Sequence, residues 1–158
     1  KKRLASGARV SVYERTECTQ HPMSGFDCAG IISRAAQICG IPYYFKNTYT
    51  LAHYLKSLSI DTHLQEGDLI WIPGHVMIVS DLKNGMLIEA RGYSSNYGTV
   101  HEIPLHHLFK DIKSYDDLIH AYHHQKPLKR LNKEGHEAEE IKKYEILKLA
   151  SVWDHASY

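Results

Sequence analysis

Three residues of the chain combine side chains and positions that suit nucleophilic catalysis. Cys28 directly follows Asp27 and precedes an apolar segment with helical spacing, so we expect it in the first turn of a helix. Unpaired backbone N–H groups and the helix dipole stabilise an anion at that position. The sequence therefore predicts a thiol with a lowered pKa, and the thiolate is the form that attacks a carbonyl carbon.

His75 and Glu89 supply the other two groups that such a reaction needs. His75 follows the Pro73-Gly74 break and opens an apolar strand, which would hold its imidazole on a rigid sheet and leave it exposed at the end of that sheet. We expect it to act as the base toward Cys28. Glu89 stands inside an apolar stretch, where burial of a carboxylate is costly unless it is hydrogen-bonded. An imidazole N–H would satisfy Glu89 and fix the tautomer of the base, as the third member of a triad does.

The residues on either side of Cys28 are candidates for the oxyanion and substrate site. Backbone N–H groups near the helix start, around Asp27 and Ala29, can hold the negative oxygen of a tetrahedral intermediate. Each catalytic candidate taken alone has a commoner structural explanation: a small apolar thiol, a structural strand histidine, and a carboxylate that faces water. The three together in this order are much less frequent by chance, and we therefore favour catalysis.

The periodicity of the sequence predicts the elements that would position these groups. A helix is expected over 28–39, with Asp27 as its N-cap and Gly40 just past its end, and a second helix over 50–58. The period then changes to that of strands, which we expect at 68–72, 75–80, 86–91, 99–104 and 118–124. This order indicates an α+β fold, with N-terminal helices packed on a central antiparallel sheet of about five strands.

The composition changes after Pro127, where the chain becomes densely charged. We therefore predict a catalytic domain over 1–127 and a charged, helical C-terminal extension over 128–158. Asn132 is the expected N-cap of the extension, and its weak apolar stripe would be formed by Ile141, Leu147 and Val152. Such a helix would pack back on the domain or mediate assembly.

The turn at Asn84-Gly85 raises a question of register. A tight two-residue turn there would place Glu89 opposite Ser80 and on the other face of the sheet from His75. A triad therefore needs an odd-length loop or a bulge between the two strands. With a tight register, a polar residue within 93–96 is the alternative partner for the base.

The overall composition excludes several kinds of function. The formal net charge is +1, which gives no electrostatic case for binding nucleic acid. No apolar run is long enough to span a bilayer. The three cysteines, Cys18, Cys28 and Cys39, cannot all pair, and none belongs to a Cys-x-x-Cys motif. That argues against both a disulfide scaffold and a zinc ribbon.

Twelve histidines leave a metal site open as an alternative. Several of them fall late in the chain: His106, His107, His120, His123 and His124. We interpret them as polar side chains on a strand and its flanks, because adjacent histidines on a strand point to opposite faces. The alternative is a metalloenzyme that uses Cys18 and His21 together with these late histidines.

Three stretches of the chain resemble the NlpC/p-sixty family of bacterial cell-wall peptidases: Phe26-Asp27-Cys28-Ala29-Gly30, Gly67-Asp68-Leu69-Ile70 and Gly74-His75-Val76-Met77-Ile78-Val79. The resemblance covers about residues 10 to 110. It implies a papain-like fold and hydrolysis of the amide between γ-D-glutamate and a diamino acid in peptidoglycan stem peptides, without a cofactor or a metal. It maps Cys28 onto the nucleophile, His75 onto the base and Glu89 onto the third polar residue. It also offers Tyr13 as the tyrosine that helps to shape the oxyanion site.

The chain departs from the family pattern in three places. Ala29 stands where the family usually has serine, and Glu89 where it most often has histidine, which is similar to the CHAP amidases. Residues 15–24 replace the usual Gly-Gly turn before the cysteine, and this puts the choice of substrate in question. Acyl transfer, deamidation or proteolysis of protein substrates by a secreted effector, and a non-catalytic binding module, therefore stay open. The resemblance implies a periplasmic or secreted protein, with the cytoplasm left open.

Overall fold

The computed structural model describes residues 27–41, 47–91 and 99–155. They form a mixed α+β fold of few, short helices and two antiparallel sheets, so the α+β part of the predicted fold is confirmed. In chain order the elements are α1 (Cys28–Ile38), α2 (Thr48–Tyr54), β1 (Lys56–Ser57), β2 (Leu69–Ile72), β3 (His75–Asp81), β4 (Met86–Arg91), β5 (Thr99–Pro104), α3 (Leu105–Leu108), β6 (Phe109–Lys110), α4 (Tyr115–His123), β7 (Leu128–Leu131), β8 (Glu137–Ile141), β9 (Glu145–Lys148) and the 3₁₀ helix η3 (Leu149–His155).

The capping of α1 agrees with the sequence prediction. The side chain of Asp27 accepts a hydrogen bond from the backbone N–H of Gly30 at 2.6 Å, which satisfies one of the unpaired donors of the first turn. Gly40 follows the helix with a φ of 67°, a conformation that few other residues adopt. The buried stripe of the helix consists of Ala29, Ile32 and Ala36. The cap and this stripe together fix where Cys28 begins the first turn.

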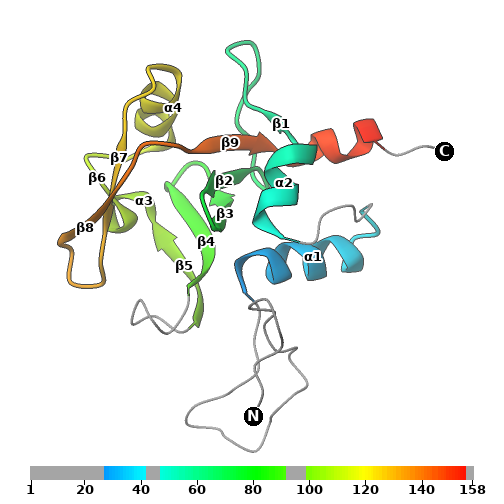
Figure 1. Ribbon diagram of the computed structural model, residues 1–158, viewed down its shortest axis with the longest axis horizontal. Helices are drawn as coiled ribbons and strands as arrows, with labels where there is room; N and C mark the ends of the chain where they lie inside the picture. Colours follow the sequence, from blue (N-terminus) through cyan, green and yellow to red (C-terminus); the bar gives the residue numbers. More distant parts are fainter. Residues whose placement is uncertain (1–26, 42–46, 92–98, 156–158) are drawn as a thin grey trace, which may run out of the picture.

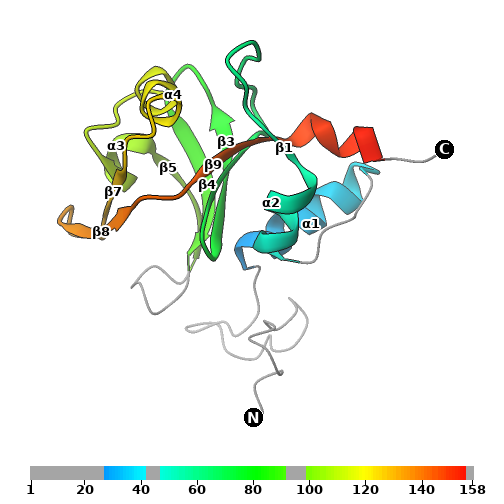
Figure 2. The same ribbon diagram turned by 45° about the horizontal axis from the view of Figure 1, so that its top comes forward.

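The main sheet has six strands in the order β1-β9-β2-β3-β4-β5, one more than the sequence prediction. The predicted strands at 68–72, 75–80, 86–91 and 99–104 correspond to β2, β3, β4 and β5. A smaller sheet of β6, β7 and β8 lies beside it, on the same side as α3 and α4 (Figures 1 and 2). Within the described ranges, no helix is long and apolar enough to cross a bilayer.

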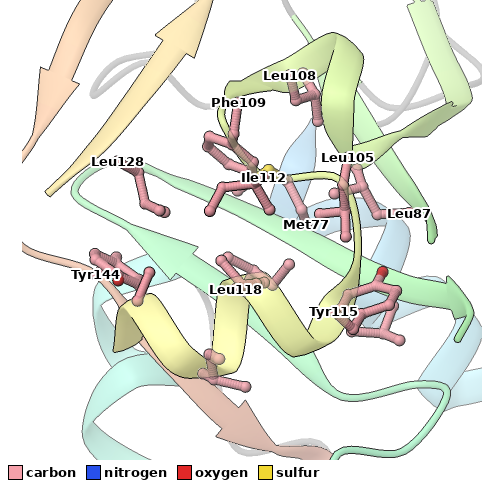
Figure 3. Packing of buried hydrophobic residues seen from close by; sticks show 14 of the residues in the cluster. Met77, Leu87, Leu105, Leu108, Phe109, Ile112, Tyr115, Leu118, Leu128 and Tyr144 are labelled. Atoms are coloured by element: carbon pink, nitrogen blue, oxygen red, sulfur yellow. The ribbon is translucent and has the colours of Figure 1, made fainter. Parts of the chain in front are cut away.

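The two faces of the main sheet are both covered, as Figures 1 and 2 show: α1, α2 and η3 lie on one side, and α3, α4 and the smaller sheet lie on the other. The side chains of β2 follow this division. Ile70 and Ile72 belong to the larger hydrophobic cluster, under α3 and α4, whereas Leu69 and Trp71 belong to the smaller cluster, under α1 and α2. Figure 3 shows the larger cluster, where Met77 and Leu87 of the sheet face Phe109, Leu118 and Leu128.

The prediction of a helical extension over 128–158 is wrong. Residues 128–148 form three strands, and β9 lies in the main sheet between β1 and β2. Ile146 and Leu147 of β9 are both fully buried, one toward each hydrophobic cluster, so the strand has no polar face that would reveal its period. Asn132 does not cap a helix but accepts hydrogen bonds from Glu134 and His136 in the β7–β8 turn.

Two further elements differ from the sequence prediction. Residues 118–124 are not a strand, because α4 begins at Tyr115 with a capping box between Ser114 and Asp117. Its buried residues Leu118 and Ala121 are three positions apart, which is helical spacing. The helix predicted over 50–58 ends at Tyr54, where the backbone extends into β1. For residues 118–124, the capping box of Ser114 and Asp117 outweighed the strand propensity of the sequence, and the segment became a helix.

Candidate active site

The hairpin of β2 and β3 places His75 at the beginning of a buried strand. Ile72 and His75 face each other across the two-residue turn Pro73-Gly74. Gly74 has a φ of 79°, which suits the position after proline in a tight turn and is unfavourable for residues with a Cβ atom. The side chain of His75 is 13% exposed, so its ring is largely enclosed and yet lies at the end of the sheet. The position at the strand start agrees with the prediction, whereas the predicted exposure of the ring is wrong.

A bulge between β3 and β4 brings Glu89 onto the same face of the sheet as His75. The register shifts between Val79 and Asp81, and Glu89 consequently lies opposite Met77 rather than opposite Ser80. His75 and Met77 are two positions apart and share a face, so Glu89 is a diagonal neighbour of His75. The bulge that a triad required is therefore present.

Glu89 is the centre of a buried polar group of residues, which we call the Glu89 cluster (Glu89, His75, His101 and Arg130). Its Oε2 atom lies 2.8 Å from Nε2 of His75 and accepts a hydrogen bond from Arg130 at 2.9 Å. Its Oε1 atom lies 3.0 Å from Nε2 of His101, which faces it from β5. The Glu89 side chain is 0% exposed, so these protein groups replace water as its partners.

The Glu89 cluster keeps the carboxylate ionised. Burial alone would raise the pKa of Glu89, but the hydrogen bond from His75, the charge of Arg130 and the hydrogen bond from His101 together lower it to about 2. An ionised carboxylate can only accept hydrogen bonds, so Nε2 must carry the proton in both imidazole rings. A neutral His75 therefore has its lone pair on Nδ1, the nitrogen that can take a proton from a nucleophile.

Cys28 is partly buried and packs with the smaller hydrophobic cluster, next to β3. Burial raises the pKa of its thiol, the backbone N–H of Val76 lowers it, and the charge of Asp27 raises it again. The net direction is upward, so the predicted lowering of the Cys28 pKa is wrong. The helix-start N–H groups do favour the anion, as expected, but they do not outweigh the loss of solvation.

Cys28 and His75 both lie beside the beginning of β3, but the His75 side chain points to the face of Met77 and the larger cluster, whereas Cys28 packs on the other face of the strand. Val76, whose N–H acts on the sulfur, is the residue after His75 and packs with Cys28 in the smaller cluster. The start of α1 lies beside the end of the sheet where β4 finishes (Figures 1 and 2). Among the residues described, no hydrogen bond joins the Cys28 sulfur to the His75 ring.

The remaining predicted residues divide into three groups. Asp27 and Ala29 flank Cys28, and the N–H of Ala29 also lowers the thiol pKa. Tyr13, Cys18, His21 and the alternative partners within 93–96 lie outside the described residues. The late histidines lie on or beside the helices α3 and α4 rather than on a strand. In the described part of the chain, no three His, Cys, Asp or Glu side chains are grouped so that they could hold a metal ion.

Sequence reasoning missed His101 and Arg130. His101 lies directly opposite Glu89 on β5, and this pairing becomes predictable once β4 and β5 are aligned as a meander. Arg130 alternates with Lys129 on β7 and shares its buried face with Leu128. The alternation of apolar and charged residues over Leu128–Leu131 indicates a short amphipathic strand with Arg130 on its apolar face. We instead predicted a helix there, because the surrounding sequence is densely charged.

Comparisons of the chain with protein-family models, with curated proteins and with solved structures find no match.

Proposed function

We propose that the protein is a papain-like cysteine peptidase or amidase of the NlpC/p-sixty type, which hydrolyses peptidoglycan stem peptides with Cys28 as nucleophile and His75 as base. One observation carries the proposal. His75 is bonded through Nε2 to a buried, ionised glutamate, and the next residue, Val76, directs its N–H at the Cys28 sulfur. An oriented imidazole and a thiol that backbone N–H groups contact, both beside the start of β3, are the two parts that cysteine hydrolysis needs.

The raised pKa of Cys28 determines how the first step proceeds. The thiol is neutral before substrate binds, so His75 accepts its proton through Nδ1 as the sulfur attacks the amide carbonyl. Catalytic hydrogen bonds are often long without substrate and tighten in the Michaelis complex, and we expect the thiol–imidazole bond to form at that stage. The new S–C bond gives a tetrahedral oxyanion, which N–H groups at the start of α1 can stabilise.

The later steps return the proton and release both products. Protonated His75 donates to the leaving amine as the C–N bond breaks, which leaves a thioester on Cys28. His75 then takes a proton from water, the hydroxide attacks the thioester, and the free acid leaves with the thiol restored. Glu89 accepts a hydrogen bond from Nε2 throughout and stabilises the imidazolium that forms twice in the cycle.

The experiment uses stem peptides that contain the amide between γ-D-glutamate and a diamino acid, with products identified by mass spectrometry. We expect the wild-type chain to cleave this amide and the Cys28→Ala variant to lose activity by about 10³-fold or more, because the proposed acyl-enzyme forms on the Cys28 sulfur. Cys39→Ser is the matched control, since Cys39 follows the same helix but is exposed. We expect it to hydrolyse the peptide at the wild-type rate.

The results separate the proposal from its rivals. A Cys28→Ala variant as active as the wild type would exclude Cys28 as the nucleophile. Cysteine-dependent cleavage or deamidation of protein substrates, with stem peptides left intact, would retain the chemistry and replace the substrate.

A binding module without catalysis is a second candidate function, and one observation favours it. A neutral, partly buried thiol is also the state of an inert cysteine. Stoichiometric binding of a stem peptide without turnover, unchanged in Cys28→Ala, would support this candidate.

A further inference from the structure

Arg130 reaches the candidate site from the smaller sheet. It lies on β7, and its guanidinium donates to Oε2 of Glu89 at 2.9 Å, the same oxygen that faces Nε2 of His75. The Arg130 side chain is 9% exposed and that of Glu89 is 0% exposed. The ion pair is therefore enclosed by the fold, and water cannot replace either partner without a rearrangement of the two sheets.

The hydrogen bonds of the Glu89 cluster fix the orientation of the carboxylate. His101 holds Oε1, while Arg130 and His75 share Oε2. Because both oxygens have partners, the carboxylate cannot turn about its terminal C–C bond without breaking hydrogen bonds that no solvent would replace.

Arg130 is also the strongest permanent charge that touches Glu89. The other cation nearby, Arg91, is farther away, with NH1 3.8 Å from Oε1. Without the Arg130 charge, the pKa of Glu89 would rise, because burial favours the protonated carboxyl and one of the opposing causes would be gone. A protonated carboxyl can donate to an imidazole as well as accept from it, and His75 would then no longer be held to one tautomer.

We propose that Arg130 is a positioning residue of the reaction, which holds Glu89 ionised and oriented so that His75 carries its proton on Nε2 and offers Nδ1 to Cys28. The inference rests on the proposed function and deepens it. It makes β7, a strand beyond the part of the chain that the family resemblance covers, necessary for catalysis. Arg130 touches no reacting atom and acts only through Glu89 and His75.

The test compares three variants of the full chain. Arg130→Met removes the charge and keeps much of the side-chain volume. Arg130→Lys keeps the charge and loses the planar donor fork. Lys129→Met is the matched control, because Lys129 is the neighbouring cation on β7 but is paired with the exposed Glu137 at 3.5 Å. The readouts are kcat, KM and the pH profile on the stem peptide, the melting temperature, and the His75 tautomer from ¹⁵N NMR of the ring.

We expect Arg130→Met to lower kcat by about 10-fold or more and to change KM by less than about 2-fold, since the substrate does not touch Arg130. Because the pKa of Glu89 rises without the Arg130 charge, the acidic limb of the kcat/KM profile of this variant should move to higher pH. The His75 ring of the variant should show both tautomers. Arg130→Lys should fall between Arg130→Met and the wild type in each measurement. Lys129→Met should match the wild type.

A folded Arg130→Met variant with wild-type kcat, pH profile and ring tautomer would overturn the inference. If Arg130→Met does not fold, Arg130→Lys decides in the same way, and wild-type values in that variant count against the inference. The NMR measurement also separates the two proposals. A ring tautomer that changes in the Arg130 variants but not in Lys129→Met supports the positioning role, even if the wild type cleaves no stem peptide, which would count against the proposed function alone.

Discussion

Nε2 of His75 lies 2.8 Å from Oε2 of Glu89, although the two residues come from different strands and are 14 positions apart. The contact depends on the bulge between Val79 and Asp81, because a regular hairpin would turn Glu89 to the opposite face. One extra residue in β3 therefore decides whether His75 has a carboxylate partner on its own face of the sheet.

Replacing Glu89 with glutamine should reduce kcat with little change in shape. The new amide has one acceptor oxygen, while His75, His101 and Arg130 all approach as donors, so its NH₂ group opposes at least one of them. We expect kcat to fall by about 10²- to 10⁴-fold, the range seen when an orienting carboxylate is lost and the tautomer changes. Steady-state kinetics measures kcat, and a melting curve shows whether the variant is folded. A folded Glu89→Gln variant with wild-type kcat would contradict the proposed role of Glu89 in orienting His75.

Glu89 should also make the fold sensitive to acid. Its pKa is lowered from 4.5 to about 2, so the ionised form stabilises the folded state at all pH values above about 4.5. That stabilisation is lost as the pH falls from about 4.5 to about 2, and it amounts to the order of 3 kcal/mol. Urea unfolding from pH 7 to pH 2.5 measures the loss. Glu89→Gln should show a smaller decrease over this interval, whereas an equal decrease in both proteins would assign the effect to other carboxylates.

The local elements around the site were predictable because short-range rules determine them. Asp27 caps α1 and Gly40 ends it, so the position of Cys28 in the first turn follows from neighbouring residues alone. The Pro73-Gly74 turn likewise fixes the start of β3 at His75. Both predictions required only a few consecutive residues.

The tertiary surroundings of these residues were not predictable in the same way. The pKa of Cys28 depends on how much protein covers the sulfur, which no local motif reveals, and the predicted direction was wrong. Arg130 meets Glu89 across 41 positions, and β9 enters the sheet between strands that precede it by more than 70 residues. Such pairings are decided by the packing of the whole chain.

The Gly67-Asp68 pair of the family resemblance has a structural role in this fold. Asp68 is 2% exposed, accepts hydrogen bonds from the backbone N–H groups of Gln65 at 2.8 Å and Leu149 at 3.0 Å, and forms an ion pair with Lys148. It therefore ties the end of β9 to the turn before β2. Asp68→Ala should destabilise the fold by about 3 to 5 kcal/mol, because two backbone N–H groups lose their acceptor and Lys148 loses its carboxylate partner, although it keeps the His63 carbonyl as an acceptor at 2.6 Å.

Chemical denaturation measures the loss of folding stability in Asp68→Ala, with Asp154→Asn as the control. Asp154 forms an ion pair with Lys56 at 2.8 Å, but both side chains are exposed, and such pairs contribute about 0 to 1 kcal/mol. A loss in Asp68→Ala no larger than that in Asp154→Asn would mean that β9 is held mainly by its hydrophobic residues.

The reactivity of Cys28 should increase when the charge of Asp27 is removed. Burial raises the pKa of the thiol above its ordinary value of 9.0, the Val76 N–H lowers it, and the Asp27 charge adds to the rise. Asparagine at position 27 can still accept from Gly30, so Asp27→Asn keeps the helix cap while it lowers the Cys28 pKa. We expect alkylation by iodoacetamide at pH 8 to become about 2- to 5-fold faster, with the midpoint of the pH profile shifted downward.

Asp116→Asn is the control for this measurement, because Asp116 lies in the first turn of α4, on the other side of the main sheet from α1 (Figure 2). Its alkylation profile should match that of the wild type. The midpoint of the wild-type alkylation profile should itself lie above pH 9.0, since burial in the folded chain disfavours the Cys28 thiolate. A wild-type midpoint well below 9.0 would instead mean that His75 already holds the Cys28 proton before substrate binds, and the first step would then start from an ion pair.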